Sequence, residues 1–200
     1  MKPRLLIFFL LATIIGHSQG LKSDKFIYGT EFRFGPSLVM YDSRTNSYFK
    51  NSVYTSGEMS VFIRNFVITG SIRYCYSHIK NLIIFSGLVL VPNDEIDISF
   101  RSLSFGYTYF VSKKFYIEPY FGFLRSDLTD KEVNHLINTQ SGFLMGFSIV
   151  RYFTFPKMQL LLFVNNNFNI SKFERANMVL GNNFYSVEIG VGTRFGKRRQ

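Results

Sequence analysis

The 200-residue chain predicts an all-β fold, namely an eight-stranded antiparallel up-and-down transmembrane β-barrel. Three observations lead to this prediction. Apolar and polar residues alternate with a period of two along many segments, as they do in strands with two unlike faces. The connections between these segments are alternately long and short, which is typical of membrane barrels. After residue 18, no segment has the ~20 continuous apolar residues that a membrane-spanning helix needs.

The N-terminus is expected to be a signal peptide. Two basic residues precede an apolar run at 5–15, and small residues follow at 16–18. The run is too short to span a bilayer as a helix, but it has the length and flanks of a secretory signal. Cleavage after Ser18 would make residues 1–18 the signal peptide and residues 19–200 the outer-membrane β-barrel domain.

The first four strands are predicted from alternation and from the turns between them. A first segment at about 26–39 ends at a polar loop, and a second at about 53–64 meets a third at about 66–78 through a tight turn at Asn65. The apolar segment 82–91 does not alternate, so we place it in a long loop before a fourth strand at about 97–110. A transmembrane strand at 82–91, accompanied by another unrecognised strand, is the alternative.

The last four strands follow the same pattern. They are predicted at about 115–124, 141–153, 157–169 and 184–195. A short polar turn at 112–114 precedes the first of them, and a short turn at Phe155-Pro156 precedes the third. The centre of the third, residues 160–164, is apolar throughout, although Gln159, Asn165, Asn167 and Asn169 can share one face. The long loops are predicted at 41–51, 79–96, 125–140 and 170–183.

Charged residues fall on the face opposite the aromatic residues, and this pattern favours a membrane barrel. An eight-stranded barrel has a lumen that side chains fill. In a soluble barrel the many phenylalanines would have to fit inside, where there is too little volume for them. We therefore expect a side-chain-filled polar lumen with an ionic network of four acids and four bases. Its predicted members are Glu31, Arg33, Glu58, Arg64, Arg73, Glu118, Glu188 and Arg194.

The last strand carries a resemblance to a known family. Its apolar residues alternate up to Phe195, with Ser186, Glu188 and Arg194 on the other face. Through this pattern, the mature chain resembles the OmpA/OmpX-type small outer-membrane β-barrel family over residues 19–200. The resemblance implies the outer membrane of a Gram-negative bacterium. It also implies that Ile189, Val191 and Phe195 form a signal for the barrel-assembly machinery, although residues 196–200 follow the phenylalanine that usually comes last.

Composition limits the partners. The chain has a formal net charge of +10, but a secreted protein is not expected to bind nucleic acid. Its partners should be outer-membrane lipid, the assembly machinery and a surface ligand on the long loops. Cys75 is the single cysteine, which excludes an intramolecular disulfide. No metal-binding or phosphate-binding motif is visible, so we expect no cofactor, and we expect a monomer.

Three functions are compatible with such a barrel. The first is a structural or adhesive role through exposed loops, with a closed lumen. The second is a narrow pore for small solutes, lined by Arg33, Arg73 and Arg194. The third is a lipid-modifying enzyme built on Ser77 and His78, which we disfavour because adjacent residues of a strand point in opposite directions. We therefore do not expect an enzyme.

Overall fold

The computed structural model describes residues 26–41, 45–49, 52–85, 88–130, 135–172 and 183–198, and nearly all of these form β-strands. The expected signal peptide at 1–18 lies outside the described residues. Within the described ranges, none of the helical structure is long and apolar enough to span a membrane.

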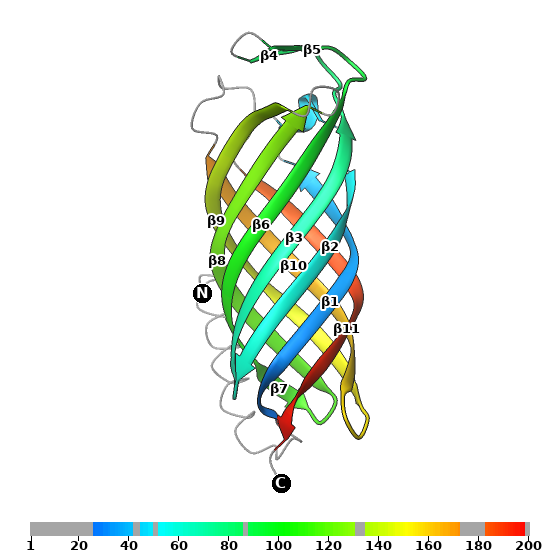
Figure 1. Ribbon diagram of the computed structural model, residues 1–200, viewed down its shortest axis with the longest axis vertical. Coiled ribbons are helices and arrows are strands. Elements are labelled where there is room, and N and C mark those ends of the chain that lie inside the picture. The colour runs from blue at the N-terminus through cyan, green and yellow to red at the C-terminus, as the bar shows by residue number, and fades with distance from the viewer. Residues whose placement is uncertain are drawn as a thin grey trace, which may run out of the picture.

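The strands close into a single antiparallel barrel (Figure 1). Closure comes from the pairing of β1 with β11 and of β6 with β8. β6 and β7 are one strand interrupted at Thr108, so the barrel has eight strands, and the predicted all-β, eight-stranded antiparallel up-and-down barrel is confirmed. The barrel strands are β1 (Phe26–Tyr41), β2 (Ser52–Ile63), β3 (Phe66–His78), β6 (Glu95–Tyr107), β7 (Tyr109–Ser112), β8 (Phe115–Asp130), β9 (His135–Thr154), β10 (Gln159–Lys172) and β11 (Asn183–Arg198).

The apolar segment 82–91 lies outside the barrel wall. It contains β4 (Ile83–Phe85) and β5 (Leu88–Leu90), which pair with each other in a separate two-stranded sheet. This small hairpin lies beyond one end of the barrel, near the short helix η1 (Thr45–Ser47) (Figure 1). The prediction that 82–91 belongs to a long loop is confirmed, and the alternative of an additional transmembrane strand is wrong.

The predicted loop at 125–140 is wrong, because most of it continues the barrel. β8 extends to Asp130 and β9 already begins at His135. Ser126 and Leu128 are buried while Arg125 is exposed, so the strand alternation persists beyond residue 124. Charged residues that face outward at this end of the wall made the sequence resemble a loop. The predicted loop 170–183 is also shorter, since β10 reaches Lys172 and β11 starts at Asn183.

The two faces of the wall differ sharply in exposure. Along β3, buried and exposed residues alternate without interruption. The apolar centre of β10 follows the same rule, with Leu161 and Phe163 buried inside and Leu162 exposed outside. The core of the molecule is therefore the barrel lumen, and the outer wall exposes many large apolar side chains. They include Phe34, Met59, Ile68, Ile72, Leu103, Phe121, Phe123, Phe143, Met145, Phe168, Ile189 and Val191.

Candidate functional site: a lumen closed in three layers

The lumen near the long loops is filled by an apolar layer. Tyr54 and Phe100 pack with ring centroids 5.3 Å apart, and Phe100 packs on Phe184 at 4.7 Å. Most of the layer comes from the strands, but Phe49, Ile79 and Leu90 come from the connecting segments. We call this set the loop-end layer: Val39, Phe49, Tyr54, Cys75, Ile79, Leu90, Ile96, Ile98, Phe100, Leu124, Leu128, Leu144 and Phe184.

Hydrogen bonds hold two connecting segments together over this layer. Phe49 and Ile79 form an isolated β-bridge. The Lys80 ammonium donates to the backbone carbonyl of Asn46 at 2.7 Å. The backbone amide of Lys80 donates to the carbonyl of Tyr48 at 2.7 Å. The segments at 45–49 and 79–81 are thus tied to each other at the mouth of the barrel.

A second apolar layer fills the lumen near the short turns. It consists of Phe110, Tyr116, Val150, Tyr152, Leu161 and Phe163, and all six are buried. The rings of Phe110 and Tyr116 lie 5.7 Å apart, and those of Tyr116 and Tyr152 lie 6.1 Å apart. Phe62 and Val67 form a small neighbouring cluster. We call the six-residue set the turn-end layer.

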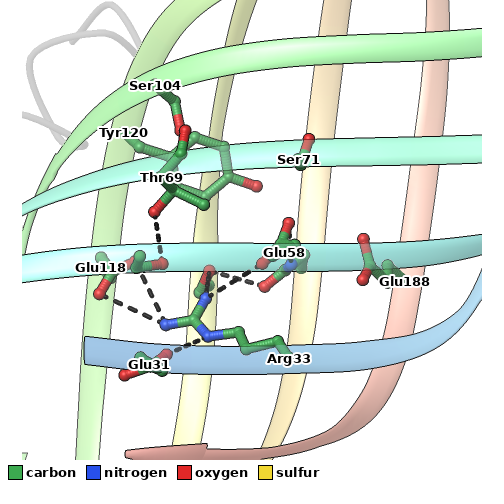
Figure 2. Close-up of polar contacts among 12 residues, drawn as sticks. Glu31, Arg33, Glu58, Thr69, Ser71, Ser104, Glu118, Tyr120 and Glu188 are labelled. Carbon is green, nitrogen blue, oxygen red and sulfur yellow. Dashed lines mark hydrogen bonds and ion pairs between the residues drawn. The ribbon is translucent and has the colours of Figure 1, made fainter.

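Between the two apolar layers lies a buried ionic cluster (Figure 2). The Nε atoms of Arg33 and Arg194 both donate to the carboxylate of Glu31, one to each oxygen. Arg33 extends from β1 across the lumen, where its Nη2 lies 3.3 Å from Glu118 Oε1 on β8. Its Nη1 lies 3.7 Å from Glu58 Oε2 on β2. Charges buried away from water need such partners to be tolerated.

The same cluster extends to a third arginine. Arg73 Nη2 lies 3.8 Å from Glu58 Oε1, and Arg73 Nε lies 3.5 Å from Glu188 Oε2. The hydroxyl of Ser56 donates to the other oxygen of Glu188. The side-chain amide of Asn165 donates to Glu58 at 3.2 Å. The structure therefore joins seven of the eight residues predicted for the lumen into one network.

Arg64, the eighth predicted lumen residue, lies elsewhere, and its assignment was wrong. It is exposed in the turn between β2 and β3, and its φ of 55° is in the left-handed region. Its backbone amide donates to the carbonyl of Ile27 at 2.6 Å. Strand β2 ends at Ile63, so its inward–outward alternation does not assign a face to Arg64. Among the described residues, the cluster holds four carboxylates and three guanidiniums.

Several polar atoms beside the ionic cluster have no hydrogen-bond partner among the described residues. They include Arg73 Nε and Nη1, Glu188 Oε2, and the hydroxyls of Ser37 and Ser186. A small cavity lined by Arg33, Glu58, Arg73, Glu118 and Tyr120 lies at the same level. It has room for about one water molecule, which needs polar partners of this kind. The cluster therefore offers a site for a bound water.

The predicted lumen charges that the network joins lie in the central layer, so the lumen is not uniformly polar along its length. Inward positions toward both ends carry large apolar or aromatic side chains, such as Tyr54, Phe100, Tyr116 and Phe163. These residues occupy the same alternate positions as the inward charged residues, and this pattern could have predicted the apolar layers. The apolar run 160–164 hid part of it, because a strand that is apolar on both faces does not alternate.

The remaining predicted site residues lie on the wall. Ile189, Val191 and Phe195 all face outward on β11, where Val191 pairs with Phe34 of β1 and Phe195 with Thr30. Ser77 is buried and lies 3.2 Å from the Ser52 hydroxyl, whereas the exposed His78 imidazole lies 3.6 Å from Glu95. Ser77 and His78 thus point to opposite faces. The described residues contain no cluster of ligating side chains suited to a metal ion.

Comparison with known proteins yields structural likeness only. No protein-family model matches the chain. No curated protein matches it in sequence. Ail, the attachment invasion locus protein of Yersinia pestis, superposes with a TM-score of 0.49 and 11% identity over 84% of this chain and 97% of that chain. Neisserial surface protein A superposes with a TM-score of 0.48 and 14% identity, over 84% of this chain and 96% of that chain. The N-terminal β-barrel domain of Pseudomonas aeruginosa OprF superposes with a TM-score of 0.47 and 10% identity, over 86% of this chain and 99% of that chain.

Proposed function

We propose that the protein is an integral outer-membrane barrel with a structural or adhesive role, whose lumen is closed. The observation that carries this proposal is the distribution of polarity: the outer wall exposes large apolar residues, whereas the lumen buries seven charged ones. Water cannot favour a wall of exposed phenylalanines, but lipid can. Closure of the barrel also leaves no strand edge, which a bilayer would not tolerate.

The three-layer lumen supports a closed barrel over a pore. A solute would have to displace the loop-end layer, break the ionic cluster and displace the turn-end layer in succession. The guanidinium of Arg33 alone contacts carboxylates on three strands, so the cluster ties opposite walls together. We propose that the cluster's role is to rigidify the barrel. The pore alternative lacks a continuous polar path among the described residues.

The two ends of the barrel differ, and this difference sets the proposed orientation. The short turns carry exposed cations, namely Arg64, Lys113, Lys114 and Lys157, and Lys197 lies at the same end. We assign this end to the periplasm, where the cations would face anionic head groups. The opposite end, where β1, β3, β8 and β10 end, would carry any surface ligand, for which the predicted loops are 41–51, 79–96, 125–140 and 170–183. The outward residues Ile189, Val191 and Phe195 are proposed as the assembly signal. No described feature favours catalysis.

The test is reconstitution of the purified, folded barrel in planar bilayers. We expect extraction from membranes to require detergent and the bilayers to show no large stable conductance. A Glu188→Ala variant should stay closed too, because both apolar layers remain. Stable openings of the unaltered protein, or openings created by Glu188→Ala alone, would overturn the closed-lumen proposal. Solubility without detergent would overturn the membrane assignment itself.

A further inference from the structure

Two arginines interrupt the apolar outer wall near its loop end. Going toward the loops along β6, the outward residues are Phe105 and Leu103, and then Arg101. Along β8 the order is Phe121 and Phe123, and then Arg125. Arg101 and Arg125 are direct partners in the β6–β8 ladder. Both guanidiniums therefore stand side by side where the apolar belt of these two strands ends.

Like charges placed directly opposite each other across two strands are destabilising, so this pair needs compensation. Asp127 supplies part of it. Its Oδ1 accepts from Arg125 Nε at 3.1 Å, and its Oδ2 lies 3.8 Å from Arg101 Nη2. The Asp127 side chain is only 9% exposed, whereas those of Arg101 and Arg125 are 64% and 56% exposed. The nearly buried Asp127 carboxylate thus contacts both exposed guanidiniums and can orient them.

Among the described residues, one carboxylate compensates two guanidiniums, which leaves a net positive charge. The described acid in ion-pair contact with the two arginines is Asp127 alone. Thr139 also donates to Asp127 Oδ1, at 2.8 Å, so this oxygen already accepts two hydrogen bonds. Because both arginine side chains are largely exposed, N–H groups that do not contact Asp127 are accessible from outside. A planar guanidinium presents a fork of donors that matches the oxygens of a phosphate group.

On the two flanking strands, the outward partners of the pair are uncharged. Ile72 of β3 pairs with Arg101, and Ser141 of β9 pairs with Arg125. Among these four paired positions, only the two arginines carry a positive charge. Its position directly beyond exposed Leu103, Phe121 and Phe123 is where a lipid with chains on these residues would place its head group.

We propose that Arg101 and Arg125, oriented by Asp127, bind a phosphate group on the head of a lipid in the outer leaflet. This inference rests on the proposed membrane location of the barrel. The lipid source is favoured over free phosphate because the apolar residues adjoining the pair offer a surface for acyl chains. The site thereby selects one lipid at a fixed place on the barrel.

The test measures lipid retention on the folded, full-length mature barrel by native mass spectrometry in detergent. The probe is diphosphorylated lipid A, with chemically dephosphorylated lipid A as the matched ligand control. The test variant is Arg101→Gln with Arg125→Gln. The control variant is Arg151→Gln, which removes an exposed outward arginine on β9, stacked on Phe153, near the turn end. We expect the double variant to retain roughly tenfold less phosphorylated lipid, and the control to retain it as the unaltered barrel does.

A conservative double variant, Arg101→Lys with Arg125→Lys, keeps the charge and loses the forked donors. Its retention should be intermediate, which separates recognition from a folding defect. Equal retention by the glutamine variant, equal retention of the dephosphorylated lipid, or binding of inorganic phosphate as tight as that of the phosphorylated lipid would each overturn the inference. A barrel that does not enter bilayers contradicts the proposed function, whereas an inserted barrel without phosphate preference contradicts this inference alone.

Discussion

The barrel holds arginine–carboxylate groups on both sides of the same wall, and the two behave differently. Inside, Arg33 is almost fully buried and contacts three carboxylates. Outside, Arg101 and Arg125 are largely exposed and share Asp127. The comparison teaches that burial decides what an ion pair does. The inner group is obligatory, because an unpaired charge there has neither water nor a partner, whereas the outer group keeps donors for a ligand.

The largest expected effect comes from removing the central cation. Arg33→Ala would leave Glu31, Glu58 and Glu118 buried with too few partners. Breaking a buried ion pair from one side costs ~3–5 kcal/mol, so this variant should fold poorly or lose about that much unfolding free energy. Arg101→Ala, the exposed counterpart, should cost under ~0.5 kcal/mol. Urea unfolding in lipid vesicles measures both, and equal losses would erase the contrast between the two groups.

The next comparison is between glycines that face inward and one that faces outward. A Cβ at Gly190 would lie 2.1 Å from the Phe34 carbonyl oxygen and 2.7 Å from the Phe163 ring. A Cβ at Gly70 would meet nothing closer than the Met59 carbonyl oxygen at 4.0 Å. Gly190→Ala should therefore lower the unfolding free energy by ~2–3 kcal/mol, as overpacking does, whereas Gly70→Ala should be neutral. A neutral Gly190→Ala would mean that the lumen is not tightly filled.

Within the inner cluster, the four carboxylates should not be equivalent. Glu31 accepts hydrogen bonds from Arg33 and Arg194, whereas Glu58 has looser ion pairs of 3.7 and 3.8 Å. Glu58→Gln would leave three acids facing three bases and retain an acceptor for Asn165. It should cost less than ~1 kcal/mol, while Glu31→Gln should cost ~2–3 kcal/mol. Unfolding midpoints of the two variants give the order, and a larger loss for Glu58→Gln would contradict it.

The smallest effect is expected outside. Asp127→Asn would leave Arg101 and Arg125 facing each other without a carboxylate. The repulsion should cost ~0.5–1 kcal/mol at low salt, and it should fade at high salt because exposed charges are screened. Unfolding at two ionic strengths measures this dependence. A loss that salt does not change would indicate that Asp127 acts through hydrogen bonding to Thr139 rather than through charge.

Much of the architecture follows from local pattern. Strand β3 was predicted at its observed bounds because period-two alternation over 66–78 has no competing interpretation. The ends of β8 and β9 were missed because outward Arg125 and Asp127 have the composition of a loop. Arg64 was misplaced because alternation carries no information about where a turn begins.

The sequence by itself determined the strand order, the inward side of the wall and the residue types on each face. These depend on neighbours two positions apart, since a strand turns successive side chains to opposite sides. Only the tertiary structure decided that seven of the predicted charges share one cluster, that apolar layers lie on both sides of it in the lumen, and that Arg101 stands beside Arg125. Each of these depends on the register between strands distant in the chain, which barrel closure sets and no single strand contains.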